Sequence, residues 1–196
     1  MMRGNGTGMT LVDSMAGVAV VTVLAGMAVP FLMAAREQSR VSAAAAYLSA
    51  QAMLARSRAV RHGAAVGLRF EADAGAYRFG SYVDGDGDGI RASDVARGID
   101  RRLGPAQRLG DVYPSVRFGL LASVPPIGSS RGAGPHADPI RFGRGDTLTF
   151  SPLGTATSGT LYLRGSGEQY AVRVLGSTGR VRVLHFDAAA GVWRQR

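Results

Sequence analysis

The chain has 196 residues and a formal net charge of +9, from 23 basic and 14 acidic residues. It contains no cysteine, which excludes disulfides and cysteine-based metal or redox chemistry. Its basic residues are all arginine and are scattered along the sequence, so the positive charge does not by itself predict a nucleic-acid partner. The length allows one globular domain behind an N-terminal segment.

An apolar segment at residues 9–35 follows a short polar leader, residues 1–8. Its one ionisable residue is Asp13, and a helix of this length would measure roughly 40 Å, enough to cross the ~30 Å hydrocarbon layer. A buried core helix would need a larger domain around it than the rest of the chain supplies. A signal peptide would have a shorter apolar core followed by small residues, whereas Gly8 precedes the apolar run. We therefore predict one transmembrane helix over residues 9–35.

The start of this segment has a recognisable pattern. Residues 8–13, Gly-Met-Thr-Leu-Val-Asp, resemble the class III leader of type IV pilins and pseudopilins. The family more often has Phe and Glu where Met9 and Asp13 stand, and both residues keep the apolar or acidic character. Pro30 falls where the family usually has a helix-bending proline. The resemblance implies that prepilin peptidase cuts between Gly8 and Met9 and that Met9 is then N-methylated.

Asp13 lies at a depth where a carboxylate is costly and is usually functional. After cleavage, the new α-amino group of Met9 would carry a positive charge, and in a filament it would neutralise Asp13 of a neighbouring subunit. The alternative is that Asp13 extends to the cytoplasmic headgroups, since it lies about one turn from the start of the segment. We favour the intersubunit pair, because the resemblance to pilins supports it.

Residues 36–62 continue the helix as a stem. They contain no proline or glycine until Gly63, which is a natural C-cap, and His62 near the end suits the helix dipole. Apolar and small residues recur on one face at helical spacing, which predicts that this face packs on a sheet. They are Val41, Ala45, Leu48, Ala52, Ala55 and Ala59.

Residues 63–196 have the period of strands. Two candidate strands, 65–70 and 76–83, are separated by residues 71–75 and form a predicted hairpin. Later candidates are 115–121, 146–151, 160–164, 169–175, 180–186 and 191–194, and residues 124–139 are expected to form a long surface loop. The sequence therefore predicts an α+β fold, in which a long transmembrane helix continues into an amphipathic helix packed on an antiparallel β-sheet.

An aspartate-rich stretch follows the predicted hairpin. Asp84, Asp86 and Asp88 alternate with glycines, and Asp94 lies downstream, an arrangement of oxygen ligands that suits Ca²⁺. The spacing departs from the EF-hand, because its twelfth position is a valine here. Asp94 or Asp100 would have to serve as the distal ligand. The alternative is a solvated acidic turn between strands.

The C-terminal half also resembles a known family. Residues 150–154 (Phe-Ser-Pro-Leu-Gly), the strand at 159–163 and residues 177–182 are similar to the C-terminal domain of the GspH/FimT family of minor pseudopilins and pilins. Membership implies a subunit of a type II secretion pseudopilus in the inner membrane, with its C-terminal domain in the periplasm. Its partners would be other pseudopilins through the N-terminal helix, the inner-membrane assembly platform and a secreted substrate.

The main alternative is a FimT-like minor pilin that binds DNA for uptake. In that branch a Gly-Arg-x-Arg motif is implicated in DNA binding, and here it is Gly179-Arg180-Val181-Arg182. Two guanidiniums on one strand face can each contact a phosphate, with Arg173 on an adjacent strand and Arg194 and Arg196 adding positive charge.

An enzymatic function has little support from the sequence. The three histidines, His62, His136 and His185, stand in no nucleophile, zinc-binding or paired-carboxylate pattern. We therefore expect a protein that is not an enzyme and requires no cofactor, with Ca²⁺ as the one candidate ligand.

Overall fold

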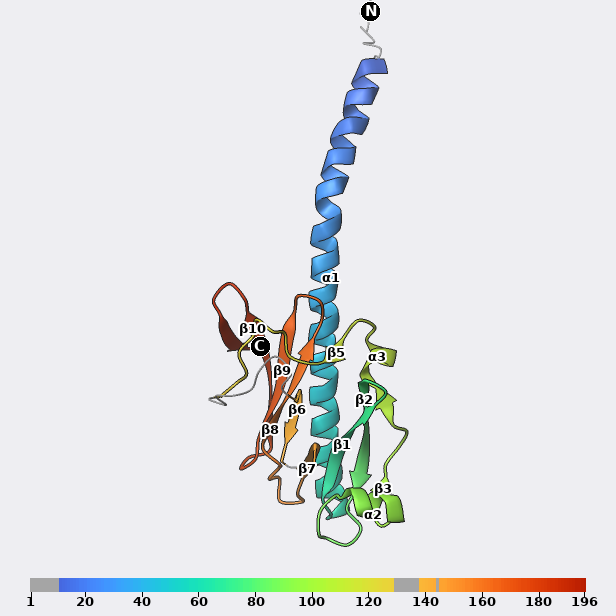
Figure 1. Ribbon diagram of the computed structural model, residues 1–196, viewed down its shortest axis with the longest axis vertical. Helices are drawn as coiled ribbons and strands as arrows, with labels where there is room; N and C mark the ends of the chain where they lie inside the picture. The colour runs from blue at the N-terminus through green and yellow to red at the C-terminus, as the bar shows by residue number, and fades with distance from the viewer. Residues whose placement is uncertain (1–10, 129–137, 144) are drawn as a thin grey trace, which may run out of the picture. The chain divides into compact units, whose positions relative to one another are not determined.

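The computed structural model describes residues 11–128, 138–143 and 145–196. The chain divides into two compact units, Met1–Glu37 and Gln38–Arg196. Helix α1, Leu11–His62, runs through the end of the first unit and into the second (Figure 1). The helix ends at His62, as predicted. Gly63 follows with a φ of 62°, in the left-handed region that favours glycine. The leader and the cleavage site at Gly8 and Met9 lie outside the described residues.

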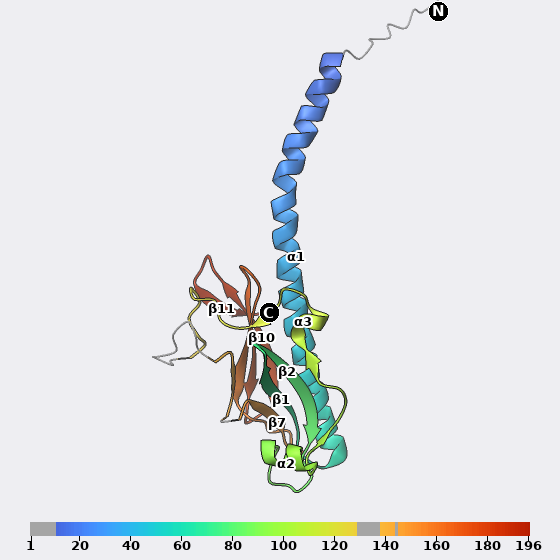
Figure 2. The same cartoon turned by 45° about the vertical axis from the view of Figure 1, so that its right-hand side comes forward.

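Within its described residues, the second unit consists of the C-terminal part of α1, two short helices and two antiparallel sheets (Figures 1 and 2). The strands are β1 Val66–Asp73, β2 Ala76–Val83, β3 Arg101–Arg102, β4 Gln107–Arg108, β5 Arg117–Phe118, β6 Ile140–Phe142, β7 Thr147–Phe150, β8 Gly159–Arg164, β9 Gln169–Leu175, β10 Arg180–Asp187 and β11 Val192–Gln195; the short helices are α2 Ala92–Arg97 and α3 Leu109–Val112.

The described strands pair into two sheets whose members are not strictly consecutive in sequence. The first has the order β3-β2-β1-β7, with β4 also pairing with β2. The second has the order β11-β10-β9-β8-β5, with β6 also pairing with β8. All the pairs are antiparallel, and β8 holds β5 at its C-terminal end and β6 at its N-terminal end. The fold class is therefore the predicted α+β fold, but with two sheets where the sequence analysis expected one.

The core lies between the stem part of α1 and the inner faces of both sheets. All six residues of the predicted stripe, from Val41 to Ala59, are at most 2% exposed. Most of them are alanines, so the helix backbone can approach the sheets closely. They form one cluster with inward residues of both sheets, including Leu68, Phe150 and Val172. The stem therefore packs as its periodicity predicts.

Several boundaries differ from the sequence prediction. The hairpin turn is Ala74–Gly75 alone, because β1 continues to Asp73, which pairs directly with Ala76. Residues 71–73, which the sequence analysis places between the two strands, therefore belong to β1. The strand expected at 115–121 is reduced to β5, and β6 lies just after the region expected to be a loop. The interior of that loop, residues 129–137, lies outside the described residues.

Candidate functional site

The apolar part of α1 is long and apolar enough to cross a membrane, and its most apolar stretch is not buried in the protein. Asp13 lies in the first turn, where a negative charge is favoured by the helix dipole. Thr22 satisfies its hydroxyl by donating to the carbonyl of Val18 at 2.8 Å, so it places no unpaired polar atom in lipid. The helix continues through Pro30, and the bend expected there stays a prediction. This segment is a single-pass membrane anchor.

The aspartate loop, residues 84–89, is organised around one buried carboxylate. Asp84 is 7% exposed, and its Oδ1 accepts hydrogen bonds from the backbone N–H groups of Asp86 and Gly87 at 3.3 and 2.8 Å. Its Oδ2 accepts a third from Gly89 at 3.0 Å. Gly87 and Gly89 have φ values of 85° and 96°, which explains why glycine occupies these positions. The shape of the loop therefore accounts for Asp84, Gly87 and Gly89.

Three carboxylates converge in this loop. One oxygen from each of Asp84, Asp86 and Asp88 lies within 4.8 Å of the other two. Desolvation raises the pKa of Asp88, and repulsion from Asp86 adds to this, although Arg91 opposes it. A divalent cation between these oxygens would relieve the repulsion, and oxygen ligands suit Ca²⁺. The geometry is thus compatible with the candidate calcium site at these three residues.

The two proposed distal ligands have other partners. Asp100 is buried, and its two oxygens accept hydrogen bonds from the N–H groups of Gly85 and Arg91 at 3.2 and 2.9 Å. Asp94 is also buried; its Oδ1 pairs with Arg97, whereas its Oδ2 has no hydrogen-bond partner among the described residues. Neither residue belongs to the group of three converging carboxylates. Asp100 instead ties the end of the loop to its beginning.

We propose that millimolar Ca²⁺ raises the melting temperature of the full-length protein. A ligand that binds only the folded state stabilises it by mass action, and loops of this kind in extracellular modules bind Ca²⁺ with Kd values of about 0.1–1 mM. The Asp86→Asn/Asp88→Asn double variant should lose the effect, because two of the three converging carboxylates are neutralised, while the capping carboxylate of Asp84 keeps the loop in shape. A melting temperature unchanged by Ca²⁺ in the parent protein would contradict the site.

Arg180 and Arg182 lie on β10, and the register places Arg182 in a row of arginines. Arg182 is directly opposite Arg173 on β9, Arg173 is opposite Thr160 on β8, and Thr160 is opposite Arg141 on β6. Like charges opposite one another on adjacent strands are destabilising, and none of the three arginines has an ion pair among the described residues. The Nε of Arg182 is buried without a hydrogen-bond partner in the same set. Arg141, Arg173 and Arg182, called the arginine row below, therefore form an uncompensated positive strip.

The other arginines expected to add charge here have internal partners. Arg194 pairs with Asp187 at 3.0 Å, and Arg196 donates to the hydroxyl oxygens of Ser42 and Tyr170 at 3.1 and 2.6 Å. The two nearest aromatic residues, Phe186 and Trp193, contact each other with ring centroids 5.4 Å apart. Their packing makes them poor platforms for stacking bases.

The glycine of the Gly-Arg-x-Arg motif has a packing role. Gly179 has a φ of 58°, and a Cβ at this position would lie 2.3 Å from the carbonyl oxygen of Gly154. The side chain of Arg56 on α1 lies against both glycines. The turn before β10 is thus held against the turn after β7. This contact explains the glycines in two segments that carried the family resemblance, residues 150–154 and 177–182.

These features define the class of protein. An apolar helix of membrane-spanning length continues into an α+β domain of antiparallel sheets, and this combination is pilin-like. A family model described as type II transport protein GspH matches residues 44–179, which is more than half of the chain, and the protein belongs to this family. The description of the family places it in type II transport. No curated protein and no solved structure matched the chain.

Proposed function

We propose that this protein is a minor pseudopilin, a non-enzymatic subunit of the type II secretion pseudopilus that takes part in protein secretion across the outer membrane. The observation that carries the proposal is the continuity of α1, whose exposed apolar part leads into the buried stem of a GspH-family domain. Such a helix can hold the subunit in the inner membrane and then in the apolar core of a filament. The C-terminal domain would lie in the periplasm.

The proposal implies a set of partners at successive stages. Prepilin peptidase would remove residues 1–8 and methylate Met9. The inner-membrane assembly platform would then insert the subunit, and other pseudopilins would pack against its apolar N-terminal helix. A secreted substrate is the remaining proposed partner, and it would meet the globular domain.

Processing is the first test of this function. We expect the mature protein to begin at Met9 with a methylated α-amino group, because Gly8 directly precedes the apolar run. Intact-mass spectrometry of the protein extracted from membranes measures both changes at once. A Gly8→Leu variant should retain the leader, because the small residue before the cut is lost. An unprocessed parent protein, or a cut after the apolar segment, would contradict the proposal.

The arginine row favours a second candidate function, in which the protein is a FimT-like minor pilin that binds DNA. Arginines without ion pairs can bind phosphate, and Arg180 lies on the same strand as Arg182, two residues before it. Two or three phosphate contacts give only weak, salt-sensitive affinity, and they carry no sequence specificity. We therefore place this function second.

DNA binding is tested with the Arg180→Gln/Arg182→Gln double variant of the full-length protein in nonionic detergent. If the second function holds, the parent binds duplex DNA at low salt, and the variant loses about two units of slope in a plot of log affinity against log salt. The Arg101→Gln/Arg102→Gln variant is a matched control, since β3 is an exposed strand on the other sheet. Equal binding by the parent and the first variant would exclude a role for the motif.

A further inference from the structure

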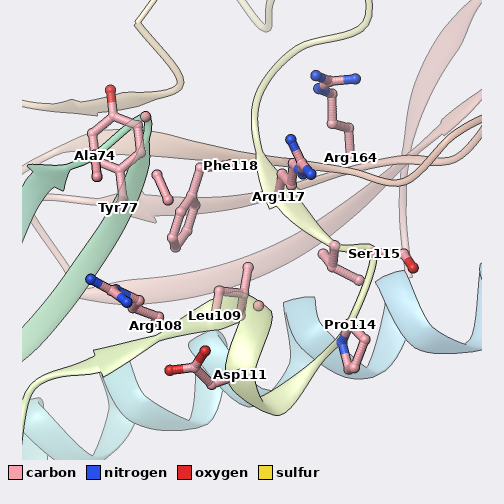
Figure 3. A pocket seen from close by; sticks show the side chains of 14 residues that line it. Ala74, Tyr77, Arg108, Leu109, Asp111, Pro114, Ser115, Arg117, Phe118 and Arg164 are labelled. Carbon is pink, nitrogen blue, oxygen red and sulfur yellow. The ribbon is translucent and has the colours of Figure 1, made fainter.

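A cavity lies where the edges of the two sheets face each other. It has a volume of about 610 Å³ and is lined by the β1–β2 turn, by Tyr77 of β2, by the segment from Arg108 to Val116 that includes α3, and by β5 with Arg164 of β8 (Figure 3). This volume is in the range of small-ligand sites. None of the residues discussed above for membrane anchoring, calcium or DNA lines it.

The cavity carries uncompensated positive charge. Arg117 of β5 is the direct cross-strand partner of Arg164 of β8, so their Cβ atoms lie about 5 Å apart. Neither arginine forms an ion pair among the described residues, whereas the third arginine of the lining, Arg108, pairs with Asp73. Asp111 is the one acidic residue in the lining. The hydrogen bond to Asp73 raises the pKa of Arg108, and the negative charge of Asp111 raises it further. An anion between Arg117 and Arg164 would convert their repulsion into two favourable contacts.

The position of Arg164 depends on a glycine. Gly119 follows β5, and its N–H donates to the carbonyl of Tyr162 at 3.0 Å. A Cβ on Gly119 would lie 2.7 Å from the Nε of Arg164. The absence of a side chain therefore lets the guanidinium group lie across the backbone at the cavity wall.

Backbone strain is concentrated in the same lining. Three non-glycine residues in the described part of the chain have positive φ, and two of them, Ala74 and Ser115, line this cavity with φ values of 48° and 75°. Such conformations cost free energy and persist where the surroundings enforce them, often at binding sites. Ala74 belongs to the β1–β2 turn, and Ser115 precedes β5.

One wall of the cavity is aromatic. Tyr77 and Phe118 meet edge to face, with ring centroids 5.8 Å apart, and Figure 3 shows them beside each other. Aromatic walls favour an apolar or aromatic side chain. The cavity thus offers a cationic part and an aromatic part within one space.

We propose that this cavity binds a carboxylate carried by another protein chain, held by Arg117 and Arg164, with an adjoining aromatic or apolar side chain against Tyr77 and Phe118. A carboxylate matches the fork of a guanidinium, and paired arginines can hold it from two sides. The proposal does not depend on whether the filament serves secretion or DNA uptake. It identifies a docking pocket in the globular domain that is separate from the apolar helix.

The test uses the full-length protein in nonionic detergent and two probes, N-acetyl-Gly-Phe and its C-terminal amide, which differ by one negative charge. Calorimetric titration should detect binding of the acid and much weaker binding of the amide. Arg117→Gln and Arg164→Gln should each weaken binding of the acid by about tenfold, because a charge-assisted contact is lost. Arg101→Gln, on the exposed strand β3, should bind like the parent.

A third probe, inorganic phosphate, separates a peptide site from a general anion site. Each variant is first shown to melt cooperatively near the parent temperature, so that a loss of binding reports on the pocket. Equal binding of the acid and the amide would overturn the carboxylate assignment. Phosphate binding as tight as that of the acid would overturn the protein-chain assignment, and no binding of any probe at about 10 mM would overturn the site itself.

Discussion

Asp13→Ala is expected to leave the protein in the membrane and to abolish its incorporation into a filament. Alanine makes the apolar helix easier to insert, because a carboxylate within the hydrocarbon layer is costly. The proposed loss is specific to assembly, since the carboxylate of one subunit would neutralise the α-amino group of Met9 on its neighbour. Without it, that amine would enter the apolar filament core uncompensated, which is strongly unfavourable.

The measurement compares the membrane fraction with the sheared filament fraction by immunoblot, in cells that assemble the parent protein. Asp13→Glu is a matched variant that keeps the charge and should assemble, and Ser14→Ala changes the adjacent residue and should do so as well. Normal assembly of Asp13→Ala would support the alternative, in which Asp13 only extends to the headgroups. Absence of Asp13→Ala from the membrane would contradict the expectation that insertion is unaffected.

The helix was the most predictable part of the fold, because its signals are local. The apolar run, the absence of glycine and proline through the stem and the cap at Gly63 all depend on residues close in sequence. The stripe from Val41 to Ala59 needs only the helical period to be recognised. The structure confirms its burial, and most long strands were also placed correctly because they alternate between two faces.

The short elements were missed for a physical reason. Strands β3, β4 and β6 have two or three residues each, too few to show alternation, and they exist because β2 and β8 offer them unpaired edges. The division into two sheets likewise depends on which strands pair across long sequence separations. Local patterns carry little information about such pairings.

In the candidate sites too, local features could be predicted from the sequence, whereas contacts between distant residues could not. The aspartate loop was visible in the sequence because its residues are contiguous, whereas the capping roles of Asp84 and Asp100 emerge only from the folded loop. Arg141 joins Arg173 and Arg182 only through the register of β6 on β8 and of β8 on β9. The cavity brings together residues from turns 40 or more positions apart, so no local motif announces it.

Gly159→Ala is expected to be among the most destabilising small substitutions in the domain. A Cβ at Gly159 would lie 2.1 Å from the carbonyl oxygen of Arg141 and 2.3 Å from Cδ1 of Phe142. The first contact is with backbone, which cannot rotate away, and Phe142 is only 1% exposed. Strand β6 would have to move off β8, which would pull Ile140 and Phe142 out of the core.

We therefore expect Gly159→Ala to lower the free energy of unfolding by about 2–3 kcal/mol, which corresponds to a melting temperature roughly 5–10 °C lower. Gly167→Ala is the matched control, because it makes the same chemical change in the turn between β8 and β9, at a site where the added Cβ would meet nothing within 4 Å. Its effect should lie within about 0.5 kcal/mol of zero. Thermal melts of both full-length variants in detergent, followed by circular dichroism, measure the difference. Equal melting temperatures would mean that β6 moves at little cost in free energy. The pairing of β6 with β8 would then contribute little to stability, although Ile140 and Phe142 are fully buried.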